Sequence, residues 1–106
     1  MGRWVRAAAV LDIPPGSAKA VRISGRWFAL FHDPEGGFHA TDDACPHEGT
    51  SLAEGVYHEG RVICTAHDWV FDVTSGRCLN MPGERLACYA TRAVGGDVEI
   101  ELEDGE

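Results

Sequence analysis

Hydrophobic residues occur along the chain in short runs that end at glycine, proline or acidic residues. Runs of this length, bounded by turn residues, are typical of β-strands. The expected strands cover residues 4–10, 18–24, 27–31, 38–41, 56–58, 61–64, 70–73, 86–94 and 98–102. In the last of them Val98, Ile100 and Leu102 alternate with glutamates, which predicts one buried and one solvent-exposed face. No window shows helical periodicity, so the pattern predicts an all-β fold, a small antiparallel sandwich or barrel.

Glycine and proline mark the connections between these strands. The chain has 13 glycines and five prolines, which suits a fold with many tight turns. Gly25-Arg26 and Glu59-Gly60 are expected to form the turns of two hairpins. The 106 residues are enough for one hydrophobic core, so we expect a single domain over residues 1–106.

The start of the chain does not resemble a secretory signal. The apolar run at residues 7–11 ends at Asp12 and is too short for the hydrophobic part of a signal peptide. No apolar stretch is long enough to cross a membrane, so we expect no membrane partner. These observations favour a cytoplasmic protein, in which cysteines are more often metal ligands or free thiols than disulfides.

The chain is acidic, with a formal net charge of -8 at pH 7. Its nine lysine and arginine residues are scattered and form no basic block. Nucleic acid is therefore not expected as a partner, because binding to its phosphates depends on clustered basic residues. An acidic surface suits a protein partner that presents a basic patch.

Two cysteine–histidine pairs lie in the turn-rich middle of the chain. They are Cys45-Pro46-His47 and Cys64-Thr65-Ala66-His67, with sixteen residues between His47 and Cys64. Each pair can place one thiolate and one imidazole on a single loop. Two such loops supply four ligands, which suits a zinc ion. The same set suits a two-iron cluster in which two histidines replace two of the usual cysteines.

The spacing of these four residues resembles the ligand signature of the Rieske [2Fe-2S] proteins. The similarity extends to residues 71–76, a strand and turn behind the second pair, and to Asn80-Met81-Pro82-Gly83, a proline-bearing third loop. It implies a Rieske-like fold with a cluster-binding subdomain over about residues 43–83, formed by the two Cys/His loops. One [2Fe-2S] cluster is implied, with its inner iron bound by Cys45 and Cys64 and its outer iron by His47 and His67.

Three positions differ from the high-potential members of that family. Thr50 and Ala66 occupy the places of two cysteines that form a disulfide in those members. Trp69 occupies the place of a serine whose hydroxyl group donates a hydrogen bond to the cluster and raises its potential. The resemblance therefore implies the low-potential branch.

The expected function is electron transfer. A fully ligated cluster leaves no open position for a substrate, and the sequence shows no nucleophile–base set or phosphate-binding loop. We therefore expect an electron carrier and not an enzyme by itself. The resemblance implies a ferredoxin that passes single electrons from a flavin-dependent reductase to a terminal oxygenase. Two alternatives remain open: the small subunit of an assimilatory NAD(P)H nitrite reductase, bound to its large subunit, and a structural zinc module.

The other cysteine, histidine and aromatic residues are expected to have structural roles. Cys88 is expected as a small core residue, and a disulfide between Cys78 and Cys88 remains open. The other histidines are expected to be solvated at strand ends: His32, His39 and His58. Three large aromatic residues are expected to fill the core: Trp4, Trp27 and Phe71. We expect Trp69 to pack in the core or to shield the cluster from water.

Overall fold

The computed structural model describes residues 2–46, 49–66 and 68–103. The first strands of this part are β1 (Gly2–Ala9), β2 (Ala18–Ile23), β3 (Arg26–His32), β4 (Phe38–Asp42) and β5 (Val56–His58). The later strands are β6 (Arg61–Ile63), β7 (Val70–Asp72), β8 (Cys88–Tyr89), β9 (Thr91–Val94) and β10 (Asp97–Glu103). Two 3-10 turns, η1 (Val10–Asp12) and η2 (Leu52–Glu54), are the only helical segments of the described residues. None of these segments could cross a membrane as a helix. The all-β expectation is confirmed.

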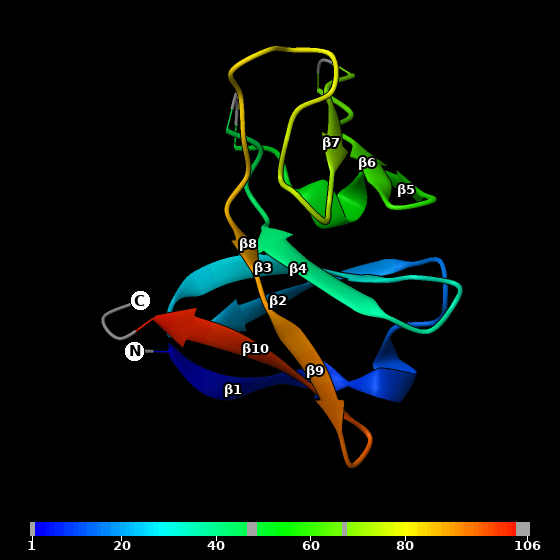
Figure 1. Cartoon of the computed structure of the whole chain (residues 1–106), viewed down its shortest axis with the longest axis vertical. Coiled ribbons are helices and arrows are strands. Elements are labelled where there is room, and N and C mark those ends of the chain that lie inside the picture. Colours follow the sequence, from blue (N-terminus) through cyan, green and yellow to red (C-terminus); the bar gives the residue numbers. More distant parts are fainter. Residues whose placement is uncertain (1, 47–48, 67, 104–106) are drawn as a thin grey trace.

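The strands form three small antiparallel sheets. Two of them, β1-β10-β9 and β2-β3-β4-β8, make the base of the molecule. The third, β5-β6-β7, lies above the base together with the loops that flank it, and we call residues 43–87 the loop lobe. These loops gather at the end of the molecule opposite the β1-β10-β9 sheet (Figure 1).

The central strand β3 is buried on both faces. Phe28 and Leu30 belong to the hydrophobic core of the base, whereas Ala29 and Phe31 belong to the core of the loop lobe. All four residues have an exposed fraction of 0%. Because successive side chains of a strand point to opposite faces, this single strand joins the two cores.

The alternating strand β10 buries the residues that the sequence predicts. Val98, Ile100 and Leu102 are fully buried in the base core, and the acidic residues between them lie on the other face. Fully burying one aliphatic side chain of this size contributes about 1.5–3 kcal/mol relative to leaving it exposed. β10 therefore anchors both of its neighbours, β1 and β9.

Two sequence expectations about strand limits are wrong. The expected strand at 86–94 is two strands, β8 paired with β4 and β9 paired with β10. The change of partner falls at Ala90, whose carbonyl group accepts a hydrogen bond from the Glu101 N–H at 2.9 Å. The first hairpin turns at Ser24 and Gly25, with φ of 51° and 83°, and Arg26 already pairs in β3. Two-residue hairpins favour such turns because their twist matches that of the strands.

His32 is buried, contrary to the expectation that it is solvated. It is 7% exposed, its ring stacks on Phe38 with centroids 4.1 Å apart, and its Nδ1–H donates to the Ile13 carbonyl group at 2.6 Å. This bond satisfies the polar atom that burial removes from water. His39 is partly buried, and His58 is exposed as expected.

The aromatic residues divide between core and surface. Phe71 is fully buried as expected, but Trp27 is 53% exposed and Trp4 is partly exposed. Trp27 lies near the start of β3, beside the surface residues Ser51 and Glu54. Trp4 lies on β1 under the Arg92 guanidinium group, 4.3 Å from the ring centre. Both residues keep part of their surface exposed to water, which hydrophobicity alone does not predict.

Candidate metal centre

The first cysteine loop, residues 45–50, follows β4 and is closed by two backbone hydrogen bonds. The Cys45 N–H donates to the Thr50 carbonyl group at 2.9 Å, and the Gly49 N–H donates to the Cys45 carbonyl group at 2.8 Å. Gly49 has a φ of 75°, which glycine adopts without steric cost. His47 and Glu48 lie outside the described residues.

Asp43 accepts hydrogen bonds from the residues that follow this loop. Its carboxylate Oδ1 accepts hydrogen bonds from the Ser51 Oγ–H and the Ala53 N–H, both at 3.0 Å. Its carbonyl group accepts a third from the Leu52 N–H at 2.7 Å. The buried carboxylate therefore joins the chain entering the loop to the chain leaving it. No local pattern indicates this role, because the partners of the carboxylate lie eight and ten positions away.

The second cysteine loop, residues 64–69, repeats the same pattern of backbone bonds. The Cys64 N–H donates to the Trp69 carbonyl group at 2.8 Å, and the Asp68 N–H donates to the Cys64 carbonyl group at 2.9 Å. Asp68 takes the place of Gly49 and has a φ of 58°. Each loop thus closes around its cysteine in the same way, with a left-handed residue four positions after it. His67 lies outside the described residues.

The two cysteines share one buried environment. Cys45 and Cys64 are each 2% exposed, and both belong to the hydrophobic cluster that contains Trp69 and Phe71. Neither thiol is in a disulfide. Trp69 packs in this core, so it excludes water around the cysteines as well as filling space. Two thiols outside any disulfide, held by matching loops in a dry site, fit an iron–sulfur group, which takes thiolate ligands.

The described residues contain no group of three or more possible metal ligands among His, Cys, Asp and Glu. Cys45 and Cys64 are the sequence-predicted ligands that the structure describes, and the ligand role of all four residues stays a prediction.

A third loop, residues 79–84, is joined to the second cysteine loop. The Leu79 N–H donates to the Val70 carbonyl group at 2.7 Å. The Val70 N–H in turn donates to Asn80 Oδ1 at 3.0 Å, and Asn80 Nδ2 donates to the Asp68 carbonyl group at 2.9 Å. Residue type alone gives no signal for this role, because the partners lie ten and twelve positions away.

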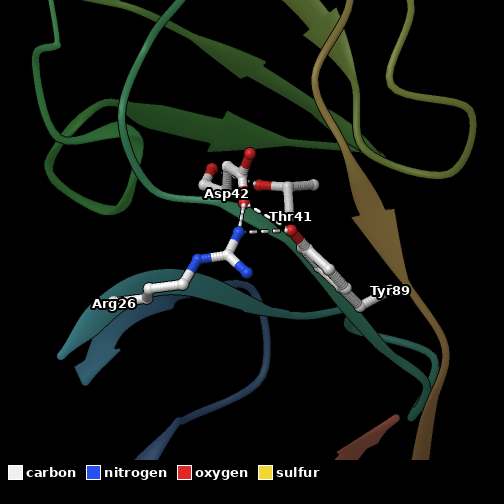
Figure 2. Close-up of polar contacts among 4 residues, drawn as sticks. All are labelled: Arg26, Thr41, Asp42 and Tyr89. Carbon is white, nitrogen blue, oxygen red and sulfur yellow. Dashed lines mark hydrogen bonds and ion pairs between the residues drawn. The ribbon is translucent and has the colours of Figure 1, made fainter. Parts of the chain in front are cut away.

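A polar network lies where the chain enters the first cysteine loop and returns from the third (Figure 2). The Tyr89 hydroxyl group donates to Asp42 Oδ1 at 2.6 Å, and Arg26 Nη2 lies 3.0 Å from the tyrosine oxygen and 3.3 Å from Asp42 Oδ1. Burial, with a further contribution from Asp42, raises the pKa of Tyr89 to about 12. Thr41 Oγ–H donates to the Asp42 carbonyl group. The network ties β3, β4 and β8 together at the foot of the loop lobe.

Cys88 is exposed, so its expected place in the core is wrong. β8 is the edge strand of its sheet, which leaves one side uncovered. Cys78 is buried and Cys88 is not, and both thiols are free, so the structure has no disulfide between them. Partial burial and the nearby Asp72 carboxylate raise the pKa of Cys88, which keeps its thiol protonated at neutral pH.

Comparison with known families decides between zinc and iron. The Rieske [2Fe-2S] domain family matches residues 3–90 of the chain. The chain belongs to this family. The zinc alternative is therefore set aside, and the cofactor of this Rieske protein is a [2Fe-2S] cluster.

Individual relatives of this Rieske protein include ferredoxins of oxygenase systems. The ferredoxin component of the naphthalene 1,2-dioxygenase system of Pseudomonas aeruginosa is 35% identical over 102 residues, which cover 94% of this chain and 96% of the relative. A chain from the solved complex of reduced oxygenase and oxidized ferredoxin in carbazole 1,9a-dioxygenase superposes with a TM-score of 0.82 at 27% identity, covering 94% and 97% of the two chains.

A solved NADH-dependent nitrite reductase small subunit from Mycobacterium tuberculosis has the same fold. Its TM-score is 0.87 at 24% identity, over 97% of both chains, and this likeness shows the fold alone. The ferredoxin match is closer in sequence and spans nearly both full lengths. The Rieske protein is therefore an electron-carrying ferredoxin, as the sequence predicts.

When bound, the cluster accepts and releases one electron at a time. Cys45 and Cys64 lie in one buried hydrophobic cluster, and their thiolates would hold the group there. Trp69 and Phe71 keep that site dry, and Asp43 holds the first loop closed. The described part of the chain thus contributes a hydrogen-bonded and largely apolar site.

Proposed function

We propose that this ferredoxin carries single electrons from a flavin-dependent reductase to the terminal oxygenase of a multicomponent oxygenase. The observation that carries the proposal is the 35% identity to a dioxygenase ferredoxin component over almost the whole of both chains. The 27% identity to a chain from a solved oxygenase–ferredoxin complex supports the oxygenase as the second partner. A single domain over residues 1–106, which the near-equal chain lengths support, leaves catalysis to those partners.

The proposed ligands are Cys45 and His47 on the first loop and Cys64 and His67 on the second. The matching hydrogen-bond frames around Cys45 and Cys64 support this assignment, because each frame places its cysteine in an equivalent position. The burial of both thiols supports it as well, since an apolar surrounding limits the access of solvent to a bound cluster. The free thiols of Cys78 and Cys88 suit the cytoplasm as the compartment.

The ligands are tested by replacing each thiol with a hydroxyl group. Cys45→Ser and Cys64→Ser are expected to yield protein without the visible absorption of the cluster. Cys88→Ser is the matched control, because this cysteine is exposed and lies outside the buried thiol site. A coloured Cys45→Ser protein with an unchanged EPR spectrum would contradict the assignment.

The partners are tested with the purified holoprotein. A flavin-dependent reductase of an aromatic-ring dioxygenase and NADH should reduce the ferredoxin, and the reduced ferredoxin should then be reoxidised by the terminal oxygenase in a stopped-flow experiment. Isolation from cells in a stable complex with a large sirohaem protein, together with no electron transfer to an oxygenase, would favour the nitrite reductase alternative.

A further inference from the structure

Asn80 contacts the second cysteine loop through both ends of its side-chain amide. Its Oδ1 accepts the Val70 N–H at 3.0 Å and also the Cys78 S–H at 3.3 Å. Its Nδ2 donates to the Asp68 carbonyl group at 2.9 Å. A carboxamide is suited to this place because it donates and accepts at once, as a peptide group does. Together with the Leu79–Val70 backbone bond, the side chain continues the pairing between the two loops.

The hydrogen bond to Asp68 holds a residue in a left-handed conformation. Asp68 is left-handed, with a φ of 58°, a conformation that costs aspartate more than glycine, although less than most other residues. Its N–H donates to the Cys64 carbonyl group and its own carbonyl group accepts from Asn80, so the peptide groups on both sides of it are fixed.

The first cysteine loop serves as an internal comparison. It has the same backbone frame, but its left-handed residue is Gly49, which adopts a φ of 75° without the steric cost of a side chain. The bracing by Asn80 therefore occurs in the loop whose conformation carries a steric cost.

We propose that Asn80 is a positioning residue, which holds the second cysteine loop in the conformation that binds the cluster. The proposal rests on the proposed ligand role of Cys64 and His67. Asn80 acts through Asp68, the residue directly after His67 in the sequence. Without the side-chain amide, the loop can relax away from the left-handed conformation and the cluster is held less firmly.

The test compares holoprotein variants at two neighbouring positions of the third loop. Asn80→Ala removes the amide, and Met81→Ala is the matched control because the Met81 side chain is exposed and takes no part in the contacts described here. With a strong iron chelator in excess, Asn80→Ala should lose its cluster about tenfold faster than the wild type, because its hydrogen bonds to the Val70 N–H and the Asp68 carbonyl group are lost together. Met81→Ala should match the wild type.

Two further readouts separate positioning from a general loss of stability. The EPR lines of reduced Asn80→Ala should broaden, because a loosened loop holds its ligand in several orientations. The Val70 amide should exchange its hydrogen faster, while the amides of β10 keep their wild-type protection. Asn80→Ala with the chelation rate and line shape of Met81→Ala would overturn the proposal.

A second substitution keeps the test decisive if Asn80→Ala does not fold. Asn80→Asp retains an acceptor for the Val70 N–H but cannot donate to Asp68 as a carboxylate, so it should also lose the cluster faster than the wild type. Wild-type behaviour of Asn80→Asp would overturn the proposal.

In an Asp68→Gly background the steric cost is gone, and Asn80→Ala should then accelerate cluster loss by a smaller factor. An undiminished factor would overturn the role through Asp68. The wild-type EPR spectrum is recorded first, and a spectrum without mixed Cys/His ligation would overturn the proposed function instead.

Discussion

The Tyr89 hydroxyl group lies between the Asp42 carboxylate and the Arg26 guanidinium group, partly buried at the foot of the loop lobe. Its short bond to Asp42 requires the protonated phenol, because a tyrosinate would face a carboxylate without a proton to share. The raised pKa of Tyr89, about 12 against an ordinary value of 10, reflects burial first and this contact second.

Removal of the hydroxyl group by Tyr89→Phe should lower the free energy of unfolding by about 1 kcal/mol at neutral pH. The folded protein favours the neutral phenol, so this contribution is complete below pH 10 and is lost as the pH rises toward 12. Urea unfolding of both proteins across this range is the measurement. A difference between wild type and variant that stays constant up to pH 12 would show that folding does not raise the pKa of Tyr89.

Two glycines with the same backbone angle have different surroundings. Gly76 and Gly60 both have a φ of 81°, but a Cβ atom at Gly76 would lie 2.2 Å from the Leu86 carbonyl oxygen, whereas at Gly60 it would meet nothing within 4 Å.

We therefore expect Gly60→Ala to cost about 1 kcal/mol, from the backbone conformation alone. Gly76→Ala should cost at least about 2 kcal/mol more, because the clash is with the main chain. Denaturant unfolding of the two variants measures the difference, and equal costs would mean that the chain at Leu86 moves aside freely.

At the scale of elements, two hairpins use the same kind of turn. Ser24-Gly25 joins β2 to β3, and Glu59-Gly60 joins β5 to β6, with positive φ at both turn residues in each case. Glycine is well placed at the second position, but neither serine nor glutamate is favoured at the first.

Glu59→Asn should stabilise the β5–β6 hairpin, because asparagine tolerates this conformation better than other side chains. Glu59→Gln is the control, since it removes the same charge without that preference. The free energy of unfolding of Glu59→Asn is expected to be about 0.5 kcal/mol higher than that of Glu59→Gln. An equal or lower value would indicate that the turn relaxes in solution.

The sequence predicts where the strands lie better than it predicts which strands pair with each other. Alternation identifies β10, and the Glu59-Gly60 pair identifies a hairpin, because both signals are local. The change of partner at Ala90 leaves no mark on the hydrophobic pattern, since both halves of 86–94 are extended.

The candidate site is predictable only in part for the same reason. The cysteine–histidine spacing identifies the two loops, but the supporting roles of Asp43 and Asn80 depend on partners brought close by the fold. Burial of His32 and exposure of Trp27 likewise follow from what covers each end of β3.

At the scale of the whole molecule, the two cysteines proposed as ligands belong to one of two cores. Cys45 and Cys64 lie in the core of the loop lobe, whereas β1 and β10 pack in the base. Removal of the cluster should therefore destabilise the loop lobe more than the base.

After removal of the cluster with a chelator under reducing conditions, amides in β5, β6 and β7 are expected to lose protection from hydrogen exchange. Amides in β1 and β10 should keep most of theirs. Mass spectrometry of peptic fragments distinguishes the two halves. A uniform loss of protection would mean that the cluster stabilises the base as strongly as the loop lobe.

The net charge of -8 also acts on the molecule as a whole. If the acidic surface attracts a basic face of the reductase, the second-order rate of reduction should fall as salt is added. An uncharged reductant provides the control, because its rate should change little. A rate that rises with salt would indicate an acidic docking face on the reductase.

The double burial of β3 has a consequence for how the chain finds its pairing. In most strands a shift of the pairing register by one residue would bury polar side chains, and this cost keeps the strand in its correct register. A slip of residues 28–31 would merely exchange two apolar faces, Phe28 and Leu30 for Ala29 and Phe31. The tight Ser24-Gly25 turn must therefore set the register of β3 against β2. One extra residue in that turn should produce slow-folding, misaligned chains even though every hydrophobic side chain is retained.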